Sequence, residues 1–264
     1  MALRLEGRAA LVTGSSRGIG AAIARKLAAH GARVIVHGGT HMEAARAVAA
    51  EIVQGGGEAQ VLQADLALAH GAAELVRSSV ALFGGLDILV NNAAVSGSGE
   101  IGEVTEEQID RTLAINLRSI LLATREYARL TRSGCGRVIN ISSIAARMPC
   151  PRGSVYAASK AAVESLTRSH AVELGPRGIT VNAVAPGVTE TDMSLAAYSA
   201  ESQRLISRAC ALGRLGKPDD IAEVAAFLCS DEAAWVTGQV IGADGGLITS
   251  AFALLRIAEA AKAE

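Results

Sequence analysis

The sequence has few aromatic residues, no closely paired cysteines and no excess of positive charge. Only 3% of its 264 residues are aromatic, while 50% are hydrophobic and 28 are glycine, so the core must consist mainly of Ala, Val, Ile and Leu. Lys and Arg number 25 against 26 Asp and Glu, which leaves no surplus of cations to neutralise a phosphate backbone. This balance argues against nucleic acid as the main partner. The apolar composition excludes a disordered or collagen-like chain.

Signals for export or membrane insertion are also missing from the sequence. The first residues, MALRLEGRAALVTG, show no basic region followed by an unbroken apolar run and a cleavage site. The longest uncharged stretches, such as residues 233–243, are shorter than the roughly 20 apolar residues that a membrane helix needs. Cys135, Cys150, Cys210 and Cys229 form no C-x-x-C pair and are expected to be reduced thiols. We therefore expect a cytoplasmic protein with no membrane partner.

Short β-rich runs alternate with longer segments of helical periodicity along almost the whole chain. Ile19, Ala22, Ile23 and Leu27, for example, recur at helical spacing. The expected strands are Ala9–Thr13, Arg33–His37, Ala59–Ala64, Ile88–Asn91, Arg137–Ser142, Thr180–Ala185 and Val240–Ala243. This alternation predicts one α/β domain, a doubly wound parallel sheet of about seven strands with helices on both faces.

The first predicted strand is followed by a glycine-rich turn. Gly14, Gly18 and Gly20 are spaced G-x-x-x-G-x-G, and a helix is expected to open at Ile19. Glycines allow the backbone to approach a pyrophosphate, and the free N–H groups of a helix start attract its charge. The alternative is an ordinary glycine-rich turn. The position of the turn after the first strand of a long α/β chain favours a dinucleotide site.

The end of the second predicted strand lacks a carboxylate. An Asp or Glu usually binds the ribose hydroxyls of NAD at this point, but here His37 is followed by Gly-Gly-Thr. No acid would repel a 2′-phosphate, and Arg17 in the glycine turn could bind one, so NADP(H) is the favoured cofactor. His37 and His41 have no third ligand nearby, and we predict no metal site.

Tyr156 and Lys160 lie four residues apart in the sequence YAASK. On a helix this spacing places the phenol and the amine on one face. A lysine beside a tyrosine should lower the tyrosine pKa and prepare it for general acid/base catalysis. The alternative is an unremarkable surface pair on an Ala-rich helix.

Taken together, the motifs resemble those of the short-chain dehydrogenase/reductase family, nearest to the 3-oxoacyl-[acyl-carrier-protein] reductase type. The matching segments are TGSSRGIG, ADL, NNA, INL, ISS, YAASK and APG, in the family's order over about residues 5–247. The resemblance implies a Rossmann-type fold and a homotetramer. It also implies a nicotinamide cofactor and a small-molecule carbonyl substrate.

The resemblance also implies roles for individual residues. Tyr156 would be the catalytic acid/base, and Lys160 would lower its pKa and hold the nicotinamide ribose. Ser143 would hydrogen-bond the substrate carbonyl, with Ser142 as the neighbour that could be confused with it. Asn116 would hold a proton-relay water.

A larger set of positions would bind the cofactor. Among them, Asp65 would bind adenine, and Thr189 and Thr191 would lie near the carboxamide. The full set implied is Gly14, Ser16, Arg17, Gly18, Ile19, Gly20, His37, Asp65, Leu66, Asn92, Tyr156, Lys160, Pro186, Gly187, Thr189 and Thr191.

Two features depart from the family pattern. The usual NNAG is NNAA here, which adds a methyl group at Ala94, and the chain continues past the usual ending. We therefore divide it into a dinucleotide-binding domain over residues 1–247 and a helical extension over 248–264. Because the extension has an apolar surface too broad for a lone solvated helix, we expect it to pack on a neighbouring subunit. Docking on its own subunit is the alternative.

The function predicted from these residues is NADPH-dependent reduction of a ketone or aldehyde, with a 3-oxoacyl thioester among the candidates. An NAD(P)-dependent alcohol or sugar dehydrogenase working in the oxidative direction is the first alternative. A non-catalytic NADP-binding regulator is a second, disfavoured because no catalytic position is broken. The substrate walls, expected over residues 95–99, 147–152 and 188–212, are the least diagnostic stretches. Arg147 and Arg152 within them could meet an acidic carrier.

Overall fold

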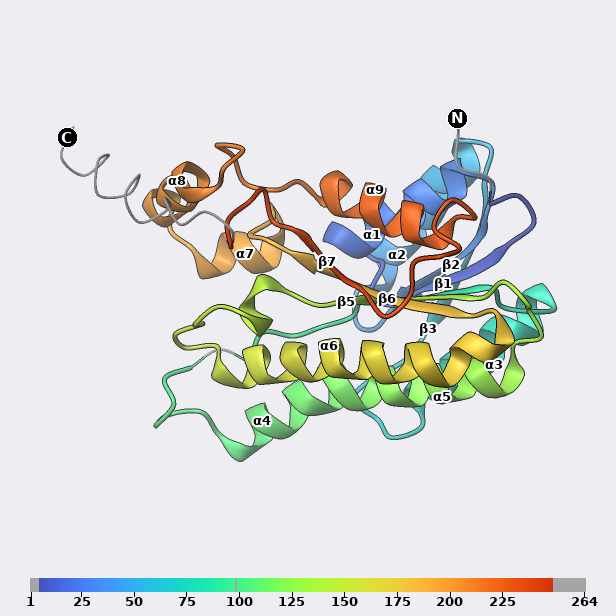
Figure 1. The fold of residues 1–264 in the computed structure, drawn as a ribbon, viewed down its shortest axis with the longest axis horizontal. Coiled ribbons are helices and arrows are strands. Elements are labelled where there is room, and N and C mark those ends of the chain that lie inside the picture. Colours follow the sequence, from blue (N-terminus) through green and yellow to red (C-terminus); the bar gives the residue numbers. More distant parts are fainter. Residues whose placement is uncertain (1–4, 98, 249–264) are drawn as a thin grey trace.

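The computed structural model describes residues 5–97 and 99–248, which form a parallel sheet covered on both faces by helices (Figure 1). The seven strands run side by side in the order β3-β2-β1-β4-β5-β6-β7. Their bounds are β1 Ala9–Val12, β2 Arg33–Gly38, β3 Glu58–Gln63, β4 Ile88–Asn91, β5 Arg137–Ile141, β6 Thr180–Pro186 and β7 Val240–Ala243. The predicted doubly wound sheet is confirmed, and each predicted strand boundary lies within one residue of the observed one.

Helices cover the two faces of the sheet as separate layers. The described α-helices are α1 (Gly18–Ala29), α2 (Met42–Gln54), α3 (Gly71–Phe83), α4 (Glu106–Leu113), α5 (Ser119–Leu130), α6 (Ser154–Leu174), α7 (Asp192–Ala197), α8 (Ala200–Ala209) and α9 (Pro218–Cys229). In Figure 1, α1, α2 and α9 lie on one face, and α3, α5 and α6 lie on the other. The shorter α4, α7 and α8 lie toward one end of the molecule. None of the helices in the described part of the chain is long and apolar enough to cross a membrane.

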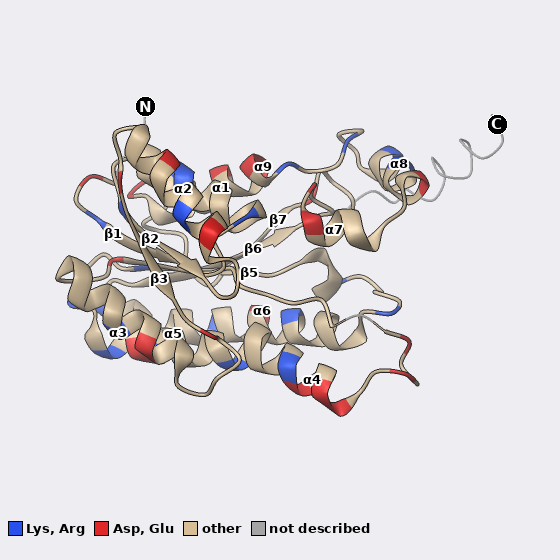
Figure 2. Ribbon diagram, turned by 180° about the vertical axis from the view of Figure 1, so that it is seen from behind, with Lys and Arg blue, Asp and Glu red and all other residues tan. Residues whose placement is uncertain are grey.

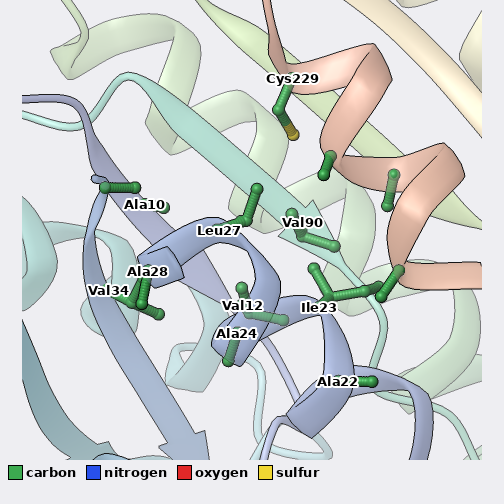
Figure 3. Close-up of a cluster of buried hydrophobic side chains, with 14 of the residues drawn as sticks. Ala10, Val12, Ala22, Ile23, Ala24, Leu27, Ala28, Val34, Val90 and Cys229 are labelled. Carbon is green, nitrogen blue, oxygen red and sulfur yellow. The ribbon is translucent and has the colours of Figure 1, made fainter. Parts of the chain in front are cut away.

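Small aliphatic side chains make the core. On the α1 face, Val12 and Val34 of the sheet pack with Ala24 and Leu27 of α1, and Cys229 of α9 closes the cluster (Figure 3). Alanines on both helices allow α1 and α9 to approach closely, as the low aromatic content predicted. Charged residues gather on the helices and loops, while few occur in the strands (Figure 2).

The sheet reverses its direction of growth at β1, which lies between β2 and β4. Ligands of doubly wound folds bind beyond the carboxyl ends of the strands at such a switch point. The approach is close here, because a Cβ placed on Gly14 would lie 2.9 Å from the Cα of Ala93. The loops after β1 and β4 therefore meet at the point where a dinucleotide would lie.

The predicted helical extension and its packing lie outside the described residues, which end at Ile248. The domain division at residue 247 and the homotetramer stay predictions.

Candidate active site

The glycine turn after β1 has the shape of a phosphate cradle. Gly14 and Gly18 have φ values of +63° and +55°, a region that favours glycine. A Cβ on Gly20 would lie 2.4 Å from Nδ2 of Asn92 and 2.5 Å from the Gly14 carbonyl oxygen. No side chain caps the start of α1 at Arg17, so its first N–H groups can face an anion. The turn therefore fits a pyrophosphate.

Asn92 fastens this turn to the loop after β4. Its Nδ2 group donates to the carbonyls of Thr13 and Gly14, at 2.9 and 3.1 Å. In return, Oγ1 of Thr13 accepts the backbone N–H groups of Asn92 and Ala93. These reciprocal bonds hold the two loops of the switch point together.

The His37 ring is buried, although the sequence predicted that it would contact the cofactor. The Gly14 N–H donates to its Nδ1 at 2.9 Å, and its Nε2 bonds the Ala64 carbonyl at 3.1 Å. The side chain is used within the protein because His37 lies on β2 between the loops after β1 and β3. The contact expected between His37 and the cofactor stays a prediction.

Arg17 lies exposed at the start of α1 and has an acidic partner. Its Nη1 is 3.1 Å from Oδ2 of Asp192 at the start of α7. Thr191, beside that acid, would lie 3.3 Å from a Cβ on Gly18. The glycine turn and the start of α7 are therefore in contact through a cation and an acid.

Ser143, Tyr156 and Lys160 come together at the carboxyl ends of β5 and β6. The Ser143 side chain lies beside the Tyr156 phenol and lowers its pKa. Nζ of Lys160 is 5.6 Å from the centroid of the Tyr156 ring and donates to the Ile141 carbonyl at 2.7 Å. Ser142 is turned away, toward the Lys160 carbonyl and Glu164. The structure thus brings Ser143, and not Ser142, beside the phenol.

The electrostatics of this group bear on the expectation that Lys160 lowers the tyrosine pKa. Burial raises the pKa of Tyr156, the Ser143 hydrogen bond lowers it, and nearby Cys150 and Tyr198 raise it further. Burial also lowers the pKa of Lys160 to about 8. The ammonium is directed at a backbone carbonyl and burial is the largest influence on both groups, while the effect expected of Lys160 on the tyrosine stays a prediction.

Asn116 lies in the π-helical turn η1 (Ala114–Arg118) and is completely buried. Its Oδ1 accepts the Val95 N–H at 2.8 Å, and its Nδ2 donates to the Val95 carbonyl and to Oγ of Ser159. Ser159 in turn donates to the Tyr156 carbonyl. The side chain thus links the loop after β4 to the helical turn that carries the tyrosine.

The other predicted cofactor positions lie along the same edge. Asp65 is exposed and accepts the Ala67 N–H, and Leu66 is buried behind it. Gly187 follows Pro186 at the end of β6, where a Cβ would lie 2.8 Å from the Cα of Asp244. Thr189 is buried, and Thr191 caps α7. Ser16 and Ile19 lie half-buried in the glycine turn.

Sequence reasoning did not single out two neighbours of the phenol, Cys150 and Tyr198. Both lie inside the stretches named as substrate walls, where no pattern distinguishes a lining residue from any other. Arg147 and Arg152, considered for an acidic carrier, have partners in the chain: Glu164 and Glu100, at 3.1 and 3.0 Å. Within residues 5–97 and 99–248, no group of three or more His, Cys, Asp or Glu side chains is arranged to hold a metal ion.

The phosphate cradle lies at the switch point, and the tyrosine group lies on the same edge of the sheet, beyond the carboxyl end of β5. This arrangement is typical of a nicotinamide-dependent oxidoreductase.

Comparison with known proteins places the chain within this class. A family model described as enoyl-(acyl carrier protein) reductase matches residues 14–248. An uncharacterized oxidoreductase of Methylorubrum extorquens is 44% identical over 246 residues, 92% of this chain and 99% of the relative. A versicolorin reductase of Emericella nidulans is 41% identical over 255 residues, 92% of this chain and 96% of the relative. The chain belongs to the short-chain dehydrogenase/reductase family.

A solved structure agrees with the fold. The short-chain dehydrogenase of Burkholderia cenocepacia in complex with NADP superimposes with a TM-score of 0.88. It is 44% identical, and the match covers 93% of this chain and 99% of that one.

Proposed function

We propose that this protein is an NADPH-dependent reductase of ketones and aldehydes. The observation that carries the proposal is that the Ser143 side chain and the buried amine of Lys160 both lie beside the Tyr156 phenol, with Nζ of Lys160 5.6 Å from the ring centroid. Bound NADPH would supply the hydride to the carbonyl carbon. Ser143 and Tyr156 would bind the carbonyl oxygen, and Tyr156 would give it a proton as the alkoxide develops.

The protonation state of Tyr156 suits the reductive direction. A phenol, with an ordinary pKa of about 10, keeps its proton at neutral pH and can serve as a proton donor. The alternative, oxidation of an alcohol or sugar, needs the phenolate as a base. Lys160, with a pKa of about 8, is largely an ammonium at neutral pH and would hold the nicotinamide ribose.

Two features support NADP(H) over NAD(H). The end of β2 carries no carboxylate, since Gly38 follows His37, and the Arg17 guanidinium is exposed at the adjoining turn. The Burkholderia relative holds NADP. Asp65 would bind the adenine, and residues 16–20 the pyrophosphate.

The substrate side favours an uncharged ketone with an apolar body. Met193 and Leu195 are 45% and 52% exposed on α7, and Tyr198 follows them beside the catalytic phenol. Because Arg147 and Arg152 pair with acids of the chain, they lose their role as a docking point for an acidic carrier. A 3-oxoacyl thioester remains the second candidate, and the relative named a versicolorin reductase supports a substrate other than a thioester.

Three further assignments belong to the proposal. Asn116 positions the loop at Val95 and the Ser159 turn through its side chain, and it holds the proton-relay water expected from the family resemblance. The protein works in the cytoplasm. It assembles as a homotetramer.

The test is a panel of quinones, diketones, β-keto thioesters and keto sugars assayed with NADPH and with NADH. We expect turnover of an apolar ketone with NADPH. Its kcat/KM should be higher than that of any thioester in the panel. Faster oxidation of an alcohol or sugar than reduction of every carbonyl tested would contradict the proposed direction. Higher kcat/KM with NADH would contradict the cofactor.

A further inference from the structure

His37 lies where three loops of the cofactor edge meet. Its backbone N–H donates to Oγ of Ser15 at 2.9 Å, and its carbonyl accepts the Ser15 N–H at 3.0 Å. Its ring accepts from Gly14 through Nδ1 and bonds the Ala64 carbonyl through Nε2. One residue at the end of β2 is thereby bonded to the loop after β1 and to the loop after β3.

The two ring contacts define the protonation state of His37. Because Nδ1 accepts an N–H, it carries no proton, so the single proton of a neutral ring lies on Nε2 and is donated to Ala64. The side chain is only 2% exposed, and burial lowers the pKa of His37, opposed by the bond to Ala64. The titratable or charged residues on the adjoining segments are Arg17, Asp65 and His41. Arg17 pairs with Asp192, and Asp65 accepts the Ala67 N–H.

The ring connects the two parts of the site that would hold the adenosine half of a dinucleotide. Gly14 opens the turn whose following residues would hold the pyrophosphate, and it has no room for a side chain. Ala64 directly precedes Asp65, which would bind the adenine. The imidazole therefore bridges the phosphate cradle and the adenine site, in addition to the backbone bonds from Ser15 to His37 and from Ala64 to Gly38.

We infer that His37 is a positioning residue for the cofactor: without touching it, the neutral ring holds the Gly14 turn and the Asp65 loop in binding position and releases them when protonated. Protonated Nδ1 would present an N–H to the Gly14 N–H, and two donors cannot pair, so the turn must move. Cofactor affinity should therefore fall as the pH drops. This inference rests on the proposed nicotinamide cofactor and names a further residue on which its binding depends.

The test is calorimetric titration with NADP⁺ and NAD⁺, which withstand acid better than the reduced forms. Wild type, His37→Asn, His37→Gln and His37→Leu are compared from about pH 8 to about pH 5. The Asn amide oxygen takes the place of Nδ1 and accepts from Gly14, whereas Gln places its amide near Nε2 and Leu removes both bonds. At pH 8 we expect the cofactor Kd of His37→Asn to lie within about threefold of the wild-type value. The Kd values of His37→Gln and His37→Leu should be about tenfold higher.

The pH series separates positioning from simple structural support. From pH 8 to pH 5 the wild-type Kd should rise at least about threefold more than that of His37→Asn, whose amide does not titrate. The 2′-phosphate of NADP⁺ titrates in the same range, so the same difference must appear with NAD⁺, which lacks that group. His170→Asn is the matched control. Its ring also has a pKa lowered by burial, but it lies on α6, fourteen residues after Tyr156, and makes none of the bonds described for the Gly14 turn and the Asp65 loop, so its removal should leave the profile unchanged.

Parallel pH profiles for wild type and His37→Asn would overturn the inference, as would equal affinities of the Asn and Gln variants. If His37→Leu does not fold, the Asn and Gln comparison and the pH series still decide. Tighter binding of NAD⁺ than NADP⁺ by wild type would contradict the cofactor in the proposed function, while the His37 comparison would then be read from the NAD⁺ titration.

Discussion

The loops after β1, β2 and β4 are braced by hydrogen bonds, whereas the segment from Thr189 to Cys210 is mostly exposed and held chiefly at its helix caps. In the first region, His37 and Asn92 bond backbone atoms of the glycine turn. In the second, Thr191 and Ser199 cap α7 and α8, while Met193 and Leu195 face outward. A cofactor that many reactions share can be bound by a rigid site built from backbone atoms. A particular substrate is bound by side chains on a less firmly held segment.

Removal of the Tyr156 hydroxyl should have the largest effect on turnover of any single change. Tyr156→Phe removes the proposed proton donor and one ligand of the developing alkoxide, so kcat should fall about a hundredfold or more. Binding of NADP⁺ should change little, because the braced loops remain intact. Steady-state kinetics and calorimetry on one preparation check both.

Tyr198→Phe is the contrasting variant for that experiment. It removes a second phenol near the same site, on the exposed wall, and should affect KM more than kcat. Near-normal turnover of Tyr156→Phe would show that the assignment of the proton donor is wrong.

Lys160→Met should lower turnover and raise stability at neutral pH. Since burial lowers the pKa of Lys160 from 10.5 to about 8, keeping the ammonium in the fold costs about 3 kcal/mol at pH 7. Leaving the Ile141 carbonyl unpaired costs about 1 kcal/mol, so a net gain of about 2 kcal/mol is expected from urea unfolding.

The pH dependence of that gain follows from the sign of the shift. The unfolded chain binds the proton more tightly than the folded one, so the penalty is complete below pH 8 and disappears as the pH rises toward 10.5. The advantage of Lys160→Met should shrink over this window. A methionine variant less stable than wild type at pH 7 would contradict the view that this amine is retained for function at a cost in stability.

Arg17→Ala tests the charge at the border of the braced region. Losing one charge-assisted contact to a 2′-phosphate should weaken NADPH binding about ten- to a hundredfold and leave NADH within about twofold. Arg25→Ala on the same helix, which breaks an exposed pair with Glu51, is the control and should change neither. Equal weakening with both cofactors would mean that Arg17 supports the turn and does not select the phosphate.

Local patterns in the sequence predicted most of the fold and brought forward the candidate site residues, whereas their long-range contacts could not be predicted. The sequence signals for the strands, the glycine turn and the Tyr156–Lys160 pair each lie within a short segment of the chain. The role of the His37 ring depends on the register of three strands, because its partners lie 23 and 27 residues away. The raised pKa of Tyr156 depends on burial and on Tyr198 from another loop, which no spacing reveals.

Asp192→Asn should have the smallest effect on cofactor affinity among these variants. It tests directly whether the cofactor loop and the substrate segment interact. The acid lies 175 residues from Arg17 and holds its guanidinium in an exposed pair, so a 2′-phosphate must compete with it. Exposed pairs are worth up to about 1 kcal/mol, so the variant should bind NADPH up to about fivefold more tightly, with NADH unchanged. The gain should shrink in high salt, because the competing attraction is screened.

Asp219→Asn, which removes an acid from the first turn of α9, controls for the loss of a charge at a helix start. Unchanged NADPH affinity at low salt would mean that the 2′-phosphate does not compete with Asp192 for Arg17. The cofactor loop and the segment from Thr189 to Cys210 would then act independently.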